Sequence, residues 1–296
     1  MSRIAVNGVH LNVETSGDGP ALLLLHGFTG GVPTWELHLE EWRDFRTIAV
    51  DLLGHGRSDC PGDPQRYGFE QTVADLVGIL DHLGVTRVAV LGYSMGGRVA
   101  LLLALHLACH SPGRLRALIL ESTSPGIEDE AERDARARSD DALAATIERD
   151  GIESFVNRWE ALPLFATQAR LPASTRERLR HQRLANDPTG LANSLRGLSV
   201  GAQRPLDEDL GRIDAPVLLI VGAQDQKYRL LARRMAARLP RARVETVSEA
   251  GHAVHLEQPA IFARAVRGFL EERAASEERS SEKVVQTGRS DPKSLA

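Results

Sequence analysis

The chain has 296 residues, of which 42% are hydrophobic and 26% charged, which is typical of a globular protein and excludes collagen-like and wholly disordered classes. Its 36 basic and 40 acidic residues give a net charge of -4, so we expect no general nucleic-acid or acidic-membrane surface. The two cysteines, Cys60 and Cys109, supply neither a disulfide framework nor a metal-ligand cluster. We therefore predict no metal and no cofactor.

The N-terminus has no basic segment followed by an apolar one, so the sequence predicts no secretory signal. The longest apolar run, residues 99–105, is far too short to cross a bilayer. We expect a soluble, cytoplasmic protein that acts on a small molecule and has no membrane partner. The sequence does not indicate an oligomeric state.

The predicted elements alternate between strands and helices. Residues 4–13 alternate in polarity around Asn7 and Gly8, a pair that favours a β-hairpin turn. Short apolar runs that predict buried strands follow at residues 21–25, 47–51, 87–91, 116–121, 216–221 and 243–247. Helical patterns occupy residues 70–83, 95–108, 229–239 and 259–272. This alternation predicts an α/β fold with a mainly parallel, twisted sheet flanked by helices.

The alternation stops between residues 122 and 210, where the sequence is charged, helix-prone and without a convincing strand. We interpret 122–210 as a helical cap inserted late in the sheet, with 1–121 and 211–273 forming the core. From 274 to 296 the chain is polar and has little to bury. We expect this last segment to be a disordered tail without function.

A Gly-x-Ser-x-Gly motif at residues 92–96 follows one predicted strand and begins a predicted helix. The pentapeptide alone is a weak signal, because a strand-to-helix turn needs glycine without any catalysis. In this context the glycines allow a strained turn that exposes the Ser94 hydroxyl at a helix N-terminus. We predict Ser94 to be a catalytic residue.

A His-Gly-Phe turn at residues 26–28 follows the strand predicted at 21–25. The backbone amides of Phe28 and Met95 could converge beside Ser94 as an oxyanion hole. The alternative is a simple turn after a buried strand.

A serine hydroxyl needs a base, and the base needs an orienting acid. Asp225 and His252 each follow a predicted strand, and the carboxyl ends of parallel strands meet at one edge of a sheet. Asp209 and Asp214 precede their strand, and His255 would face elsewhere if a helical turn starts there. We therefore predict a Ser94–His252–Asp225 triad.

These motifs resemble the α/β-hydrolase superfamily in order and spacing over residues 1 to 272. Several longer stretches resemble, within it, the family of 2-succinyl-6-hydroxy-2,4-cyclohexadiene-1-carboxylate synthases of menaquinone biosynthesis. These stretches are residues 26–30, 92–98, 121–126, 159–165 and 222–228. The resemblance implies the α/β-hydrolase fold and a lyase that eliminates pyruvate, with Ser94 acting as a base through His252.

The substrate of that family carries three carboxylates, and arginine can bind a carboxylate through two parallel hydrogen bonds. The resemblance implies substrate contacts from Arg98, one helical turn beyond Ser94, and from Arg136 and Arg183 in the cap. Arg133 and Arg138 are alternatives to Arg136 if the register is shifted. Substrate contacts are also implied for two aromatic residues, Tyr93 and Trp159.

The sequence leaves two alternatives to the lyase open. A hydrolase of esters, or of carbon–carbon bonds in dienoates, would use the same triad, so the triad cannot separate it from a lyase. A non-catalytic receptor could retain the fold, although an intact triad argues against that reading.

Overall fold

The computed structural model describes residues 2–287 of the chain, and the side chains of residues 2–274. The described strands form one sheet in the order β1-β2-β4-β3-β5-β6-β7-β8. Their bounds are β1 (Ser2–Val6), β2 (Val9–Ser16), β3 (Ala21–Leu25), β4 (Arg46–Val50), β5 (Val88–Tyr93), β6 (Leu115–Glu121), β7 (Val217–Gly222) and β8 (Ala242–Val247). The first two strands pair antiparallel with each other, and β2 with β4, while the other pairs are parallel. The sheet confirms the predicted α/β class.

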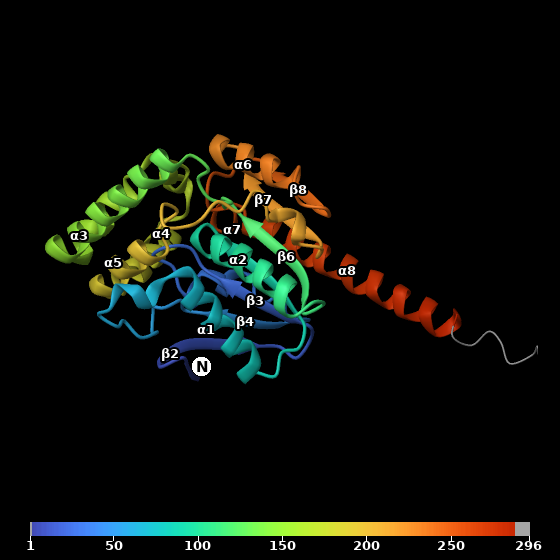
Figure 1. Ribbon diagram of the computed structural model, residues 1–296. Helices are drawn as coiled ribbons and strands as arrows, with labels where there is room; N and C mark the ends of the chain where they lie inside the picture. The colour runs from blue at the N-terminus through green and yellow to red at the C-terminus, as the bar shows by residue number, and fades with distance from the viewer. Residues whose placement is uncertain (1, 288–296) are drawn as a thin grey trace, which may run out of the picture.

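The helices lie on both faces of the sheet and at one of its edges (Figure 1). Their bounds are α1 (Phe69–His82), α2 (Met95–His110), α3 (Glu130–Glu160), α4 (Ala173–Leu184), α5 (Pro188–Gly197), α6 (Gln226–Ala236), α7 (Val254–Glu257) and α8 (Pro259–Thr287). Short 3-10 segments add Val32–His38, Pro64–Tyr67, Pro163–Arg170 and Leu210–Arg212.

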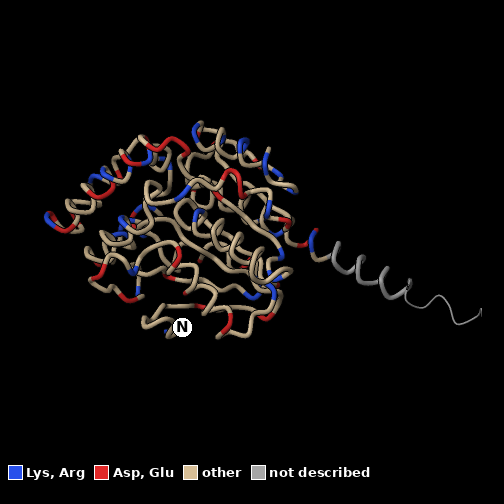
Figure 2. Tube along the Cα trace, in the orientation of Figure 1, with Lys and Arg blue, Asp and Glu red and all other residues tan. Residues whose placement is uncertain are grey.

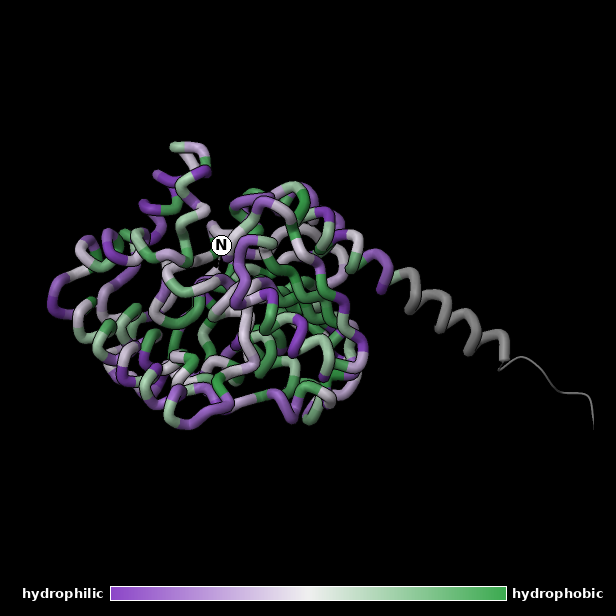
Figure 3. The backbone as a smooth tube through the Cα atoms, turned by 90° about the horizontal axis from the view of Figure 1, so that it is seen from above, coloured by the Kyte–Doolittle hydropathy of each residue, from purple (hydrophilic) through white to green (hydrophobic). Residues whose placement is uncertain are grey.

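Alternate residues of the central strands pack on opposite faces of the sheet, as the pleat of a strand requires. Leu23 and Leu25 belong to the apolar cluster that includes residues of α1, α2 and α6. Leu22 and Leu24 belong to the cluster on the other face, with Trp42 and residues of α8. The hydrophobic parts of the trace therefore lie in the interior of the molecule (Figure 3).

The insertion between β6 and β7 is helical, and its helices α3, α4 and α5 gather together beside the sheet (Figure 1). It has a small apolar cluster of its own, in which α3 packs against α5. Gly151, with φ 78° and ψ 171°, divides α3 into two helical segments at a kink. Basic and acidic residues alternate along α3 (Figure 2), which explains why its hydrophobic pattern is weak in the sequence.

The last helix is longer than the sequence predicts. We expected a helix over 259–272 and a disordered tail from 274, but α8 continues to Thr287, and residues 288–296 lie outside the described part of the chain. The physical reason is composition: alanine, glutamate and arginine, which recur here, are strong helix formers.

Candidate active site

Ser94 lies at the turn between β5 and α2, in a backbone conformation that few residues other than glycine adopt. Its φ is 51° and its ψ is -107°. Three hydrogen bonds hold this turn: the Ser94 amide donates to Glu121 O at 2.8 Å, and Ser94 O accepts from Thr123 Oγ1 at 2.8 Å and from the Arg98 amide at 3.1 Å. A strained residue held by its surroundings is typical of an exposed nucleophile.

Glycine is required on both sides of Ser94 because the backbone is crowded there. A Cβ on Gly92 would overlap the carbonyl of Gly96, and a Cβ on Gly96 would overlap the carbonyl oxygens of Leu25 and His26. Since backbone atoms cannot move aside, Gly92 is required by the packing of β5 against α2, and Gly96 by the packing of α2 against the end of β3.

Ser94, His252 and Asp225 are brought together by three different loops. His252 Nε2 lies 3.1 Å from Ser94 Oγ, and His252 Nδ1 lies 2.8 Å from Asp225 Oδ2. The side chains of His252 and Asp225 are almost completely buried. The second carboxylate oxygen of Asp225 accepts from the Tyr228 amide at 3.2 Å, which fixes the acid at the start of α6. This is the geometry in which an imidazole can take a proton from a serine hydroxyl.

The loop that carries His252 is held by Glu257, one turn further along the chain. Its carboxylate accepts hydrogen bonds from the amides of Gly251, at 2.7 Å, and Ala253, at 3.3 Å. The two amides flank His252, so the glutamate fixes the backbone on both sides of the imidazole.

The predicted oxyanion amides come from two segments. Phe28 lies in the turn after β3, and Met95 is the first residue of α2. A hydrogen bond of 2.9 Å from the Gly30 amide to Gly27 O closes the turn that carries Phe28. Within the described part of the chain, neither the Phe28 nor the Met95 amide donates a hydrogen bond to another protein group. Both residues line the same cavity as Ser94, so their N–H groups can serve a developing oxyanion.

A cavity of about 530 Å³ lies between the sheet edge and the cap, and Ser94 and His252 line it. Its wall combines apolar residues of the cap with charged groups from α2, α3 and α6. Two of the three predicted substrate-binding arginines, Arg98 and Arg136, line this cavity. The volume suits a small-molecule substrate.

Arg98 is the cation closest in sequence to Ser94 in this wall. Its guanidinium lies 5.5 Å from the ring centre of Phe69, and its Nη1 is buried without a hydrogen-bond partner among the described residues. Burial lowers the pKa of Arg98 to about 10, with the positive charge of Arg136 adding to the effect and Tyr228 and Asp140 opposing it. A half-buried cation whose buried Nη1 has no acceptor among the described residues is a site for an anion.

Arg136 is half-exposed and already bound to an acid. Its Nε lies 2.8 Å from Asp140 Oδ1, and Asp140 Oδ2 accepts from Ser199 Oγ at 2.7 Å. The bond orients the Arg136 side chain on the wall of the cavity. Arg138, two residues away on α3, is exposed and does not line the cavity.

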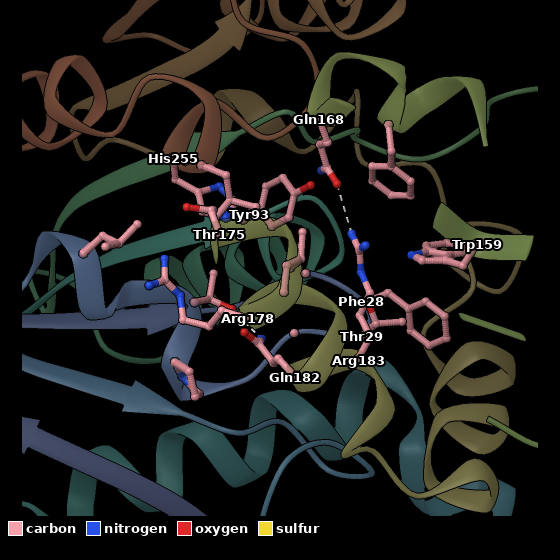
Figure 4. Close-up of a pocket in the computed structure, with 18 residues that line it drawn as sticks. Phe28, Thr29, Tyr93, Trp159, Gln168, Thr175, Arg178, Gln182, Arg183 and His255 are labelled. Atoms are coloured by element: carbon pink, nitrogen blue, oxygen red, sulfur yellow. Dashed lines mark hydrogen bonds between the residues drawn. The ribbon is translucent and has the colours of Figure 1, made fainter. Parts of the chain in front are cut away.

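Arg183 lies apart from the other two arginines. It lines a second, smaller cavity of about 50 Å³ (Figure 4), which we call the side cavity, and not the cavity of Ser94. Its guanidinium donates to Glu160 Oε1 at 3.1 Å and to Gln168 Oε1 at 3.2 Å. Burial lowers the pKa of Arg183, and the hydrogen bond and charge of Glu160 raise it.

Tyr93 and Trp159 are common to both cavities, as are Phe28 and Phe165. Trp159 packs edge-on against Phe28, with ring centres 5.3 Å apart, so the cap contacts the loop that carries the oxyanion amide. Burial raises the pKa of Tyr93 well above its usual value, so its phenol stays protonated.

Sequence reasoning missed two aromatic residues around the catalytic imidazole. Tyr228 lies 4.5 Å from His252 between ring centres, and Phe165 lies 6.3 Å away. Tyr228 follows Asp225 by three residues, and Phe165 belongs to a stretch already singled out in the sequence. Their approach to His252 depends on how the cap and α6 are placed, which periodicity does not give.

The described residues contain neither a metal-binding cluster nor a membrane-spanning helix. No cluster of three or more histidine, cysteine, aspartate or glutamate side chains there has the geometry of a metal site. Among the described helices, none combines the length and the apolar character that crossing a bilayer requires.

Comparison with a family model gives the class of protein. Residues 20–259 match the family described as the alpha/beta hydrolase fold. The chain therefore belongs to the α/β-hydrolase family, and the predicted fold is confirmed.

Similar proteins narrow this assignment. A Bacillus subtilis (strain 168) protein provisionally named 2-succinyl-6-hydroxy-2,4-cyclohexadiene-1-carboxylate synthase is 44% identical over 89% of this chain and 96% of its own length. The synthase of that name from Serratia proteamaculans (strain 568) is 33% identical over 87% of this chain and 95% of its own. The structure of MenH from S. aureus matches 90% of this chain and 99% of that chain, with a TM-score of 0.82 and 36% identity. Within the α/β hydrolases, the chain belongs with these synthases.

Proposed function

We propose that this protein is a lyase of menaquinone biosynthesis. It eliminates pyruvate from 2-succinyl-5-enolpyruvyl-6-hydroxy-3-cyclohexene-1-carboxylate and forms 2-succinyl-6-hydroxy-2,4-cyclohexadiene-1-carboxylate. The observation that carries the proposal is the presence of Arg98, a half-buried cation with an unpaired buried donor, in the cavity of the Ser94–His252 pair. The names of the relatives with 33% and 44% identity support it.

In this reaction Ser94 acts as a base and not as an acylating nucleophile. His252 Nε2, at 3.1 Å, takes the hydroxyl proton, and the serine oxygen then removes a proton from a ring carbon of the substrate. Asp225, at 2.8 Å from Nδ1, balances the charge of the imidazolium that forms.

The electron pair left by that proton moves onto a substrate oxygen, which becomes negative. The amides of Phe28 and Met95 are the donors available to this oxygen, and the N-terminus of α2 adds a favourable field. As the negative charge returns to the ring, the bond from the ring to the enolpyruvyl oxygen breaks and that oxygen takes the proton held by the His252 imidazolium, so the three-carbon acid leaves as the enol of pyruvate and His252 is neutral again.

Three arginines are the candidates to bind the carboxylates of the substrate. Arg98 and Arg136 stand on the wall of the main cavity, and Arg183 lies behind the shared aromatic wall. We assign carboxylate contacts to Arg98 and Arg136 first, with Arg183 serving a group that reaches into the side cavity. We assign further substrate contacts to Tyr93 and Trp159, which line both cavities.

The proposal is tested with purified protein and two substrates. Pyruvate release from the enolpyruvyl precursor is followed with a coupled dehydrogenase, and ester cleavage is followed with p-nitrophenyl acetate. We expect fast pyruvate release and slow ester turnover. Robust ester turnover without pyruvate would establish the hydrolase alternative and overturn the lyase.

The cytoplasmic location and the absence of nucleic-acid partners stay predictions from the sequence. Cell fractionation tests the first, and a filter-binding assay with duplex DNA and RNA tests the second.

A further inference from the structure

A second carboxylate–imidazole pair lies behind the candidate active site. Glu121, the last residue of β6, has both carboxylate oxygens 2.9 Å from His255 Nδ1. Its Oε1 also accepts from the His255 amide at 3.0 Å. Both side chains are buried, with 0% and 1% exposure, and neither belongs to the triad. A buried carboxylate–imidazole pair is weak evidence for stability, so its presence beside a catalytic centre indicates a functional role.

The free nitrogen of this imidazole is Nε2, because Nδ1 is held by the carboxylate. Among the described residues, no protein group forms a hydrogen bond with His255 Nε2, while His255 lines the side cavity (Figure 4). The ring is fixed against Tyr93, with centres 4.5 Å apart, and against Trp35, at 5.5 Å. The pair thus resembles Asp225–His252 in chemistry, but its imidazole lines the side cavity, whereas His252 lines the main cavity.

The side cavity offers donors that have no acceptor. Arg183 Nε and Gln168 Nε2 are buried without a hydrogen-bond partner in the part of the chain that the structure describes, and so is Trp159 Nε1. All three atoms are N–H donors, and Arg183 carries a positive charge. Buried donors need acceptors, so a ligand with oxygen acceptors and negative charge fits this wall.

The size of the cavity limits what this ligand can be. About 50 Å³ is room for a few heavy atoms and not for a substituted ring. Arg178, an exposed cation on α4, also lines it and extends the positive wall toward solvent. These features together point to a small monocarboxylate.

The proposed elimination produces such a molecule, so the inference rests on the proposed function. The group that leaves is the enol form of pyruvate, and its methylene carbon, C3, must gain a proton before pyruvate is formed. We infer that the Glu121–His255 pair transfers protons to and from C3 of a small 2-oxo acid held in the side cavity.

The step is a tautomerisation and needs no oxidant. The N–H bond at His255 Nε2 breaks, and the C2–C3 π electron pair of the enol forms the new C3–H bond with that proton. The enol O–H loses its proton to water, its electron pair completes the C2=O bond, and His255 regains a proton from water. The Glu121 carboxylate, 2.9 Å from Nδ1, balances the charge of the imidazolium.

The reverse direction can be measured with pyruvate alone. The folded protein is incubated with pyruvate in D₂O buffer, and loss of the methyl signal is followed by proton NMR. We expect exchange faster than in buffer, and about 100-fold slower exchange with His255→Asn or Glu121→Gln. Ser94→Ala should exchange at the wild-type rate. His110→Asn, on the exposed end of α2, is the matched control and should behave like wild type.

Exchange no faster than in buffer would overturn the inference, and so would loss of exchange in Ser94→Ala, which would assign the activity to the triad. If His255→Asn does not fold, Arg183→Met decides the question, because it leaves the pair intact and removes the anion contact. Wild-type exchange in Arg183→Met would contradict the side-cavity site. Pyruvate release without exchange refutes only this inference, and exchange without pyruvate release refutes the proposed function.

Discussion

Ser94 Oγ lies 3.1 Å from His252 Nε2, at the start of α2 and on the wall of the main cavity. The Ser94→Ala variant removes the oxygen that we assign as the base and leaves the imidazole and its acid in place. We predict a loss of turnover of roughly 10³–10⁶-fold with little change in the midpoint of thermal unfolding. Pyruvate release and a melting curve measure the two quantities. Near-normal turnover would remove Ser94 from the mechanism.

Arg98→Ala removes the half-buried cation one helical turn beyond Ser94. Loss of a charge-assisted contact to a carboxylate should lower kcat/KM by about 30-fold, which corresponds to about 2 kcal/mol. Arg138→Ala, on the exposed side of α3, is the matched control and should leave kcat/KM unchanged. Equal values for Arg98→Ala and wild type would place Arg98 outside the substrate site.

The charge of Arg98 should also make kcat/KM depend on pH. Burial lowers the pKa of Arg98 to about 10, and a guanidinium is charged below its pKa, so the anion site is lost as the pH rises through about 10. We expect kcat/KM of the wild type to fall there, since this ratio reports the free enzyme. A fall of the same size in Arg98→Ala would assign the titration to another group.

His38 makes stability depend on pH at the acidic end. Burial, with the nearby His255, lowers the pKa of His38 to about 3, whereas in the unfolded chain it is near 6.5. Between these values the unfolded state binds more protons, so stability is lost as the pH falls below 6.5. His38 alone should account for about 2 kcal/mol of the loss between pH 7 and pH 5.

The His38→Phe variant tests this prediction, because it keeps a ring against Trp42 and Phe262 and cannot take up a proton. Urea denaturation at pH 7 and pH 5 should show a smaller loss of unfolding free energy than in wild type. The exposed His82, changed to phenylalanine, serves as the control. Equal losses in His38→Phe and wild type would contradict the buried neutral state of His38.

Gly96→Ala tests the packing of the turn. The added methyl group would overlap the carbonyl oxygens of Leu25 and His26, so we predict a loss of about 1–3 kcal/mol in unfolding free energy and weaker pyruvate release. Gly268→Ala is the matched control, because open space surrounds that position on α8. There alanine should stabilise the helix by up to about 1 kcal/mol. A stable, fully active Gly96→Ala variant would contradict the crowded turn.

The strands and the core helices could be predicted closely from the sequence. Residues 21–25 match β3 in full, and the other predicted strands of the sheet begin and end within two residues of their positions in the structure. The reason is that the runs in the middle of the sheet are buried on both faces and that all of the runs are bounded by turn residues. The loops that carry Ser94, Asp225 and His252 follow three of these strands, so the order of elements was enough to predict where they meet.

The contacts of the cap could not be predicted in the same way. The sequence favours Arg98 first and leaves open which cap arginine, Arg136 or Arg183, contacts substrate. The structure divides them between two cavities, because Arg183 on α4 lines the side cavity. Glu121 and His255 are 134 residues apart and meet only in the folded protein. Spacing alone does not show what the ring of His255, three residues after the triad histidine, faces in the folded protein.

The central claim is tested most directly by comparing kcat/KM for pyruvate release from the enolpyruvyl precursor with kcat/KM for p-nitrophenyl acetate, both measured for wild type and Ser94→Ala. The account predicts that the ratio strongly favours pyruvate release in the wild type and that this activity is lost with Ser94. A wild-type protein that cleaves the ester and releases no pyruvate would contradict it.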